Sequence, residues 1–583
     1  MPSPKLKLTL PLACLTALGL LAAPNRAQAC GGTFCDNLPQ PMPVDQSGED
    51  ILFVLDGQEV EVHIRIQYEG DAERFAWVVP LQGIPEVSVG SEPLFQALSQ
   101  TTAPSWDVST QYDCDEDRPG WGAEDSGGFS PSLDIGNDTD GGGPDVVLEE
   151  TVGAFEVLVL QGGTAQEVVD FLTLNDYAQD PAAVPILQQY LDEDFLFAAV
   201  KLTAGAAVEE IHPLSFRFPG TEPCVPIRLT RIAAVDDMGI RTYFLAEDRW
   251  APSNYAHAVL NPVAYDWDSA GADAYLELLS LAVDEAGGRA FVTEYAGPSS
   301  AVPDGALFRD SWDEAAFIGV DPIQAIDLIA QQQLNTHPLI RSLLMQFIPP
   351  PMDVDAQDFW NNIEFYQDQI DLNAWDDVEF AAAILERIIE PGLHASDLLG
   401  LWPKLTRLNT TMSPFEMNVD PVFHPNADLE DVSDPDRVTV EQILCGGDAV
   451  YHVDLDGDDT PVCVPEVSSY PDFAGQMPRL LRSEQIPMMG PPQVSTDNRE
   501  TILQVHAAYE EGVACTPIEV ADTGDSEGDG DPGGEDESTG TGPNYDLPYD
   551  VSCGCSTERG AAPVGVGLGL LVLALIGPWR RRD

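Results

Sequence analysis

The sequence predicts an α+β protein with a strand-rich N-terminal region, a mainly helical middle region, a disordered acidic linker and a C-terminal hydrophobic helix. Two observations predict this class. Apolar and polar residues alternate over residues 59–68, which is the period of a strand with one buried face. From about residue 266, apolar residues recur at helical spacing between helix caps. Strands and helices without regular alternation favour α+β over a parallel α/β fold.

The strand-rich region is predicted to span residues 30–265, with an acidic flexible loop over 113–150. Asp56-Gly57 is a typical hairpin turn between Ile51–Leu55 and the alternating run. The polar face of that run carries His63, which we therefore expect to be a core-strand or surface histidine and not a catalytic base. Further strands are predicted at Phe75–Val79, Phe155–Leu160, Phe195–Leu202, Leu214–Phe218, Val225–Ile232 and Thr242–Leu245.

Capping signals mark the predicted helices. Thr164 with Glu167 forms a capping box in the first region. The helical region, residues 266–430, has helices predicted at Tyr275–Ala286, after Asp321-Pro322, at Pro338–Ile348, and after Asp376 with Glu379. Residues 431–520 are rich in Pro and Asp, contain cysteines, and are predicted to be irregular.

The chain is strongly acidic, with 98 Asp and Glu against 26 Lys and Arg and a formal net charge of −72. Nucleic-acid binding is therefore not expected, since it needs basic surface. Docking on anionic lipid is disfavoured for the same reason. With 44% hydrophobic residues, the chain can still build real cores. Because such a surface repels itself, we expect a saline environment or bound cations to screen it.

Both ends of the chain carry targeting signals. Residues 1–29 have two lysines, an apolar stretch and an A-x-A site ending at Ala29, which predicts a signal peptide cut before Cys30 by signal peptidase. A lipobox that modifies Cys30 is the alternative. Residues 521–552 predict a disordered acidic linker. Residues 553–583 then contain Cys553, Cys555, a transmembrane segment at 560–579 and three arginines.

This three-part tail resembles the C-terminal sorting signal of myxobacterial surface proteins, the MYXO-CTERM type. The resemblance implies that sorting machinery removes the segment near Cys553 and Cys555 and that the protein is lipid-anchored. A plain transmembrane anchor remains the alternative. Either reading predicts a protein exported through the inner membrane and held at the cell surface or outer membrane.

Several N-terminal motifs resemble the bacterial secreted family called domain of unknown function 2330. They are Cys30-Gly31-Gly32-Thr33-Phe34-Cys35, Val44-Asp45-Gln46, Tyr68-Glu69-Gly70-Asp71-Ala72 and Phe75-Ala76-Trp77-Val78-Val79-Pro80. Residues 405–407 and 413–423 are similar to a later stretch of that family. The resemblance implies an extracytoplasmic α+β protein without an assigned activity, so it supplies no catalytic residue.

The cysteines and aspartates give the candidate sites. In an oxidising compartment, the closest pairs for disulfides are Cys30 with Cys35 and Cys445 with Cys463. The sequence has no C-x-x-C motif and no clustered histidines, which argues against zinc. A calcium site is possible at Asp454, Asp456 and Asp458, although the turn glycine and the final glutamate of a calcium loop are missing.

The sequence contains no hydrolase, zinc-protease or nucleotide-binding motif, so no catalytic or cofactor-binding residue is predicted. We expect a secreted, surface-anchored protein with a non-enzymatic binding, adhesive or envelope role toward an unidentified extracellular ligand. The alternatives are a hydrolase that uses a carboxylate pair or a cysteine such as Cys224, and a calcium-binding surface protein.

Overall fold

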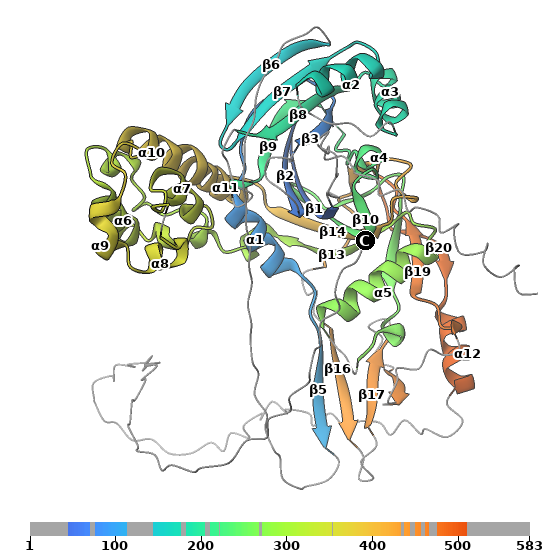
Figure 1. Ribbon diagram of the computed structural model, residues 1–583. Helices are drawn as coiled ribbons and strands as arrows, with labels where there is room; N and C mark the ends of the chain where they lie inside the picture. Colours follow the sequence, from blue (N-terminus) through green and yellow to red (C-terminus); the bar gives the residue numbers. More distant parts are fainter. Residues whose placement is uncertain are drawn as a thin grey trace, which may run out of the picture. The chain divides into compact units, whose positions relative to one another are not determined.

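The computed structural model describes residues 45–69, 76–112, 144–175, 182–203, 210–220, 222–267, 271–352, 354–432, 437–443, 449–455, 461–465 and 475–509. These residues form many strands and several helices, which confirms the α+β class (Figure 1). The predicted signal peptide, acidic linker and C-terminal segment lie outside the described residues and stay predictions. Among the helices that are described, none combines the length and the apolar character needed to span a bilayer.

The largest sheet in the described chain has ten strands. β1 pairs antiparallel with β2 and parallel with β10. The sheet also contains four strands that follow residue 265, so it crosses the predicted boundary between the strand-rich and helical regions. In spatial order the strands are β20 (Gln493–Asp497), β19 (Leu480–Gln485), β12 (Ala256–Leu260), β13 (Ala290–Pro298), β14 (Lys404–Met412), β10 (Ala234–Ala246), β1 (Asp45–Asp56), β2 (Glu59–Glu69), β9 (Leu214–Pro219) and β4 (Glu86–Val89).

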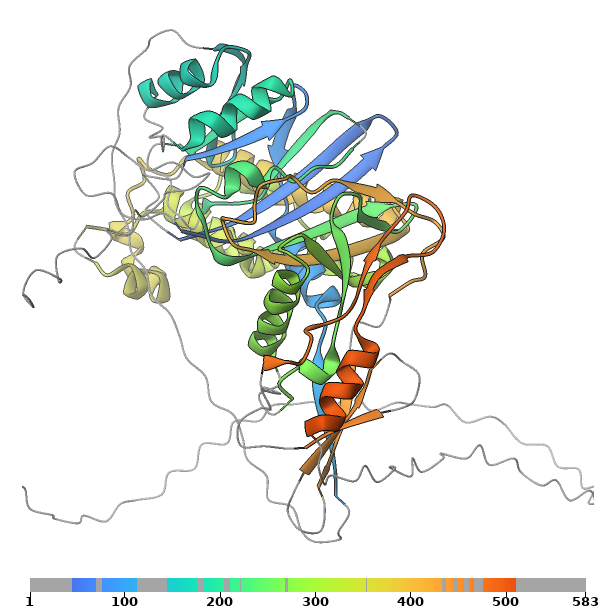
Figure 2. The ribbon, with the colours of Figure 1, turned by 90° about the vertical axis from the view of Figure 1, so that its right-hand side faces the viewer.

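Three smaller sheets complete the described strands. The first is antiparallel, and helices α2 (Ala165–Leu174) and α3 (Ala183–Asp192) lie along it in both ribbon views (Figures 1 and 2). Its order is β3 (Ala76–Leu81), β8 (Leu196–Leu202), β7 (Phe155–Gln161) and β6 (Asp145–Val152). The others are β18 (Pro461–Pro465), β17 (Ala449–Asp454), β16 (Arg437–Ile443) and β5 (Trp106–Tyr112), and the pair β11 (Trp250–Pro252) and β15 (Phe423–Pro425).

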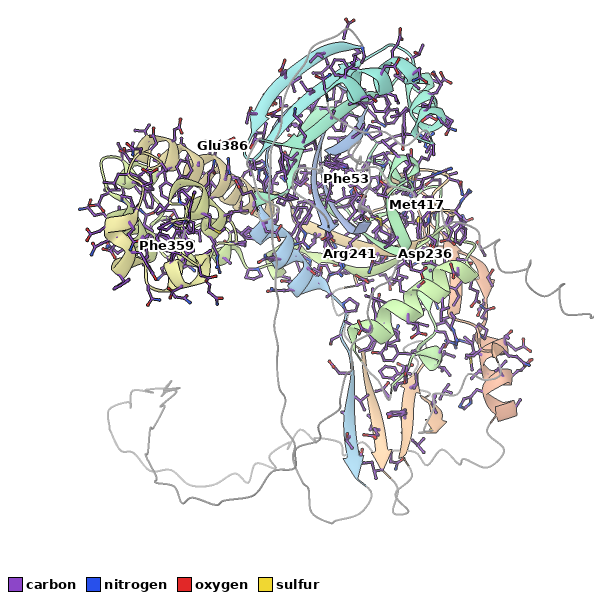
Figure 3. All side chains as sticks on the ribbon, viewed as in Figure 1. Phe53, Asp236, Arg241, Phe359, Glu386 and Met417 are labelled. Atoms are coloured by element: carbon purple, nitrogen blue, oxygen red, sulfur yellow. The ribbon has the colours of Figure 1, made fainter. Side chains whose placement is uncertain are left out.

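The helices of the described residues fall into two sets. Those associated with the sheets are α1 (Glu92–Thr102), α2 (Ala165–Leu174), α3 (Ala183–Asp192), α4 (Ile227–Thr230), α5 (Ala272–Glu285) and α12 (Arg499–Tyr509). Those between β13 and β14 are α6 (Pro322–Gln331), α7 (Ile340–Phe347), α8 (Ala356–Asn361), α9 (Ile363–Tyr366), α10 (Asp377–Ile384) and α11 (Glu390–Leu401). α6 to α10 share a core that includes Phe359 (Figure 3), whereas the apolar residues of α11 belong to another cluster. Short 3₁₀ turns lie at Pro262–Ala264, Ser299–Ala301, Asp304–Ala306, Glu314–Phe317, Leu334–Thr336 and Gln367–Gln369.

The β1–β2 hairpin is buried on both faces. Ile51 and Phe53 pack into the core that the large sheet shares with the β3–β8–β7–β6 sheet. Leu52 and Val54 point the other way, into a cluster built with apolar residues of α1 and α11. This second layer covers the face of β2 that the sequence predicted to be polar. His63 on that face is only 2% exposed.

The predicted hairpin, most of the predicted strands, the capping box at Thr164 and the N-cap at Asp321 are confirmed. The strand predicted at Val225–Ile232 is wrong, because residues 227–230 form the short helix α4. Pro226 lies at the N-cap of that helix and has no N–H to give to a sheet. Residues 431–520, predicted to be irregular, contain β16 to β20 and α12 within their described parts.

α10 and α11 form one continuous helical path joined by a π-helical turn at Leu385–Ile389. Pro391 sits in the first turn of α11, where a proline in a regular helix would clash with the carbonyl four residues earlier. The wider turn, in which the Glu390 N–H bonds to the Leu385 carbonyl, accommodates this proline. The path carries the helical region back to the large sheet.

Glu49 on β1 is a buried carboxyl, 3% exposed, whose Oε2 has no hydrogen-bond partner in the described structure. Burial, aided by the nearby charge of Asp50, raises the pKa of Glu49 from 4.5 to about 7. The folded state therefore binds an extra proton between these pH values, and stability falls as the pH rises through them. We expect Glu49→Gln to unfold like wild type near pH 4.5 and to be more stable by about 3 kcal/mol at pH 8.

Urea denaturation at both pH values tests this prediction. Glu59→Gln, which changes an exposed carboxylate on the neighbouring strand, is the control and should show no such pH-dependent gain. An equal effect of Glu49→Gln at pH 4.5 and pH 8 would show that Glu49 does not titrate differently in the folded state.

Candidate functional site

Glu61 and His63 are two residues apart on β2, so their side chains project from the same face of the sheet. α11 packs on that face, where Ala395 and Leu398 join Leu52 and Val54 of β1 in one apolar cluster. This packing brings His394 of α11 beside Glu61. The three side chains come from elements 333 positions apart in the sequence.

One carboxylate oxygen joins the two histidines. Oε1 of Glu61 accepts hydrogen bonds from Nε2 of His63 at 2.7 Å and from Nε2 of His394 at 2.5 Å. The two imidazole rings are stacked, with centroids 5.8 Å apart and planes at 23°. The candidate ligand atoms of the three residues all lie within 4.8 Å of one another. In the described part of the chain, they form the cluster of His, Cys, Asp or Glu side chains best placed to hold a metal ion.

The cluster keeps its carboxylate charged. Burial acts to raise the pKa of Glu61, but the hydrogen bonds from His394 and His63 outweigh it and hold the pKa far below its usual 4.5. In turn, the hydrogen bond to Glu61 outweighs partial burial and raises the pKa of His394 above 6.5. Without an ion, the three residues are a charged hydrogen-bond network that ties α11 to β2.

The donor set fits a transition-metal ion. Two imidazole nitrogens and one carboxylate oxygen are a recurring set for catalytic zinc and for non-haem iron. Ligand atoms about 2.0–2.1 Å from a tetrahedral ion lie about 3.3 Å apart. Binding an ion would therefore lengthen each distance from Oε1 of Glu61 to a histidine Nε2, now 2.7 and 2.5 Å, by less than about 1 Å. Nδ1 of His63 has no partner in the described structure, so its Nε2 alone orients the ring toward Glu61.

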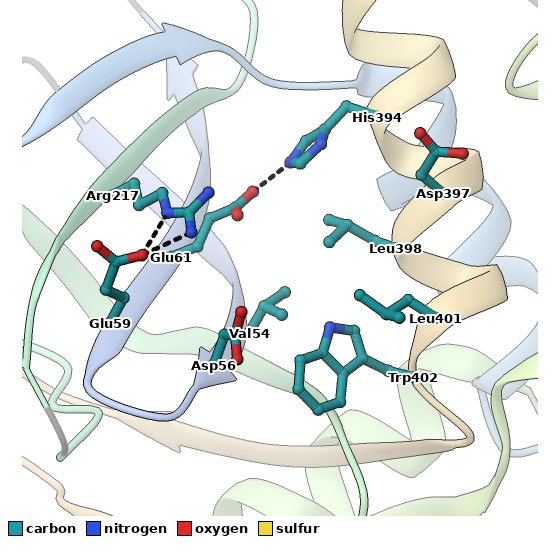
Figure 4. Close-up of a pocket in the computed structure, with 10 residues that line it drawn as sticks. All are labelled: Val54, Asp56, Glu59, Glu61, Arg217, His394, Asp397, Leu398, Leu401 and Trp402. Atoms are coloured by element: carbon teal, nitrogen blue, oxygen red, sulfur yellow. Dashed lines mark hydrogen bonds and ion pairs between the residues drawn. The ribbon is translucent and has the colours of Figure 1, made fainter.

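A pocket of about 210 Å³ opens beside the cluster, between the β1–β2 hairpin and α11 (Figure 4). Glu61 and His394 line it, whereas His63 lies behind them in the buried layer. Arg217 of β9 also reaches the pocket, where it pairs with Glu59 at 2.5 Å. The remaining lining residues are Val54, Asp56, Asp397, Leu398, Leu401 and Trp402.

Two residues of the π-helical turn bind the backbone of Gly153 and hold α11 in place. Glu386 accepts the Gly153 N–H at 2.7 Å, and Arg387 donates to the Gly153 carbonyl at 2.9 Å. Gly153 has φ +60° and lies against His212, where a Cβ would come within 2.2 Å of Nε2. A side chain cannot fit at residue 153, which keeps its backbone open to Glu386 and Arg387.

The sequence-predicted site residues are only partly described. Asp454 is exposed at the end of β17, while Asp456 and Asp458 lie outside the described residues. Cys463 is buried in β18 and disulfide-bonded, but Cys445 is outside the description, so their pairing stays a prediction. The predicted roles of five further residues also stay predictions, because these residues lie outside the described ranges: Ala29, Cys30, Cys35, Cys553 and Cys555.

Cys224, the predicted nucleophile of the alternative hydrolase, is a free thiol at an isolated bridge to Val422. Burial, reinforced by the nearby Asp420 carboxylate, raises the pKa of the Cys224 thiol far above 9.0. The side chain of Arg228 offsets only part of this effect. A thiol with so little thiolate is a poor nucleophile.

We therefore expect Cys224 to react with Ellman's reagent at pH 8 at least about ten times more slowly than free cysteine. The reaction of the wild type is compared with that of Cys224→Ser, so that the difference isolates this thiol. In denaturant the wild type should gain one reactive thiol over the variant. Fast native labelling that Cys224→Ser abolishes would instead support the cysteine hydrolase.

A local sequence pattern contains two of the three cluster residues. Glu61 and His63 alternate on one strand face, which is a usable signal for two ligands. His63 is predicted to be a core-strand or surface histidine; the structure buries it in the core, and the pattern does not reveal its partners. Nothing local marks His394, because its approach to β2 depends on packing between elements far apart in the chain.

Comparisons with known proteins identify a family model but no activity. Residues 24–307 match the model described as an uncharacterized protein conserved in bacteria, DUF2330. The matched segment contains Glu61 and His63 and ends before His394. No curated protein matches the chain.

Solved structures of baculovirus P35 are weakly similar. The crystal structure of baculovirus P35 shares 13% identity, with a TM-score of 0.22 over 35% of this chain and 66% of that chain. A mutated P35 after caspase cleavage, solved at 3.1 Å resolution, shares 13% identity, with a TM-score of 0.20 over 36% of this chain and 70% of that chain. Another, solved at 2.7 Å resolution, shares 11% identity, with a TM-score of 0.20 over 37% of this chain and 77% of that chain. Likeness at this level does not establish a shared fold.

Proposed function

We propose that the protein is an exported, surface-anchored protein whose folded body binds a divalent transition-metal ion through Glu61, His63 and His394. One observation carries the metal site, namely the convergence of both Nε2 atoms on Oε1 of Glu61 at 2.7 and 2.5 Å. Zinc is the ion that we expect, because it takes His and Glu ligands in a tetrahedral set.

Export and anchoring rest on the two ends of the sequence. The residues 1–29 have the features of a signal peptide, and the acidic linker with the apolar segment 560–579 would hold the body away from the membrane. The sorting machinery and signal peptidase are the expected partners of these ends. The calcium role of Asp454, Asp456 and Asp458 is a second, independent expectation from the sequence.

Isothermal titration of zinc into the EDTA-treated mature protein tests the site. We expect one equivalent to bind through the cluster in the wild type and to be lost in Glu61→Gln. Glu59→Gln is the matched control, since Glu59 lies on the same strand and pocket but pairs with Arg217. Equal zinc binding by Glu61→Gln and the wild type would overturn the proposed site.

A further inference from the structure

We propose that the ion at this site is catalytic and that the adjoining pocket hydrolyses small, uncharged esters. This inference rests on the proposed metal site and adds a reaction and a substrate class to it. It is carried by the position of the three ligands relative to the pocket, by one unpaired carboxylate on α11, and by the shape and charge of the pocket walls.

An ion held by these three residues would have its open coordination position toward the pocket. Three protein ligands on a catalytic zinc ion leave a fourth position for water. His63 is 2% exposed and approaches from the buried layer, whereas Glu61 and His394 line the pocket. A water on the fourth position would therefore stand in the pocket, where a substrate can reach it.

Asp397 is the carboxylate best placed to act as a general base. It lies three residues after His394, on the next turn of α11, and it lines the same pocket (Figure 4). Of the other pocket carboxylates, Glu61 is a ligand, Glu59 is paired with Arg217, and Asp56 lies beside the hairpin turn. Asp397 has no hydrogen bond or ion pair in the described structure that would occupy it.

The pocket walls select the substrate. About 210 Å³ is below the usual range for drug-sized ligands, so the substrate must be small. Val54, Leu398 and Leu401 give an apolar wall for a short acyl or alkyl group. Four carboxylates against one paired arginine disfavour an anionic substrate.

Trp402 forms the far end of the pocket. It caps α11, the helix that carries His394, and its ring lines the pocket (Figure 4). Because its Nε1 is buried, the indole adds apolar surface to the pocket wall and not a hydrogen-bond donor.

The reaction consumes one water and needs no oxidant or reductant. The ion-bound water loses a proton to Asp397, and its oxygen bonds to the ester carbonyl carbon. The bond from that carbon to the alcohol oxygen breaks with its electron pair, and Asp397 returns the proton to the departing oxygen. The products are a carboxylic acid and an alcohol.

Release of p-nitrophenol from p-nitrophenyl acetate by the zinc-loaded mature protein tests the inference, with bound zinc measured on the same samples. We expect zinc-dependent turnover that is slower by at least tenfold for p-nitrophenyl hydrogen succinate, which is anionic. Asp397→Asn should lower kcat about 100-fold or more while binding a full equivalent of zinc. Glu61→Gln, without zinc, gives the background rate.

The outcomes separate this inference from the metal site. If the protein binds one zinc at the cluster but hydrolyses no faster than Glu61→Gln, the catalytic inference is overturned and the metal site stands. If zinc-dependent turnover survives in Asp397→Asn at the wild-type kcat, the assignment of the base is overturned. If no zinc binds at all, both proposals are overturned.

Discussion

Zinc is expected to stabilise the wild-type protein against unfolding by about 2.7 kcal/mol at a free zinc concentration about 100 times its Kd. The reason is that Glu61, His63 and His394 meet only in the folded state, since two lie on β2 and the third lies on α11. The ion would join the sheet to the helix, and unfolding would have to release it. Thermal denaturation with and without zinc measures the effect.

Variants at the cluster separate this effect from zinc bound elsewhere on an acidic chain. Glu61→Gln and His394→Ala should remove the zinc-dependent rise in melting temperature, whereas Glu59→Gln should keep it. An equal rise in Glu61→Gln would show that the ion stabilises the protein from another site.

Replacing Arg407 with methionine is expected to destabilise the protein by about 3–5 kcal/mol, because it leaves a buried carboxylate without its cation. Arg407 of β14 and Glu294 of β13 are 4% and 3% exposed and form an ion pair at 2.5 Å. Glu294 also accepts hydrogen bonds from Tyr275 and Asn409, both at 2.7 Å. It sits at an irregularity in the β13–β14 register, which points its side chain into this network.

Urea denaturation of matched variants tests the origin of that loss. Arg407→Met with Glu294→Gln should recover part of the stability, because the neutral amide still accepts from Tyr275 and Asn409. Glu156→Gln breaks a partly exposed pair with Lys201 at 3.0 Å and should cost less than about 1 kcal/mol. If Arg407→Met were as mild as Glu156→Gln, the buried pair would not have the role assigned to it.

Local patterns predicted the local structure well. The alternation of β2, the Asp56-Gly57 turn, the capping box at Thr164 and the N-cap at Asp321 each depend on residues a few positions apart, and the structure contains all of them. The same patterns could not show that the second face of β2 is covered. A polar face usually indicates solvent exposure, but the cover comes from α1 and from α11, and α11 lies much later in the chain.

The candidate site escaped prediction for the same reason. A search for zinc looks for ligands spaced closely in sequence, but His394 reaches Glu61 across 333 positions. The helical path that places His394 beside β2 contains a π-helical turn followed by Pro391, and proline usually signals the end of a helix. The sequence offered only Glu61 and His63, and their spacing alone does not distinguish ligands from a buried polar pair.

An anomalous difference map at the zinc edge, from crystals of the zinc-loaded mature protein, tests the central claim most directly. We predict a peak about 2.0–2.2 Å from a carboxylate oxygen of Glu61 and from Nε2 of both His63 and His394, with its open side toward Asp397. Peaks only at other places, with both Nε2 atoms still hydrogen-bonded to Glu61, would contradict it.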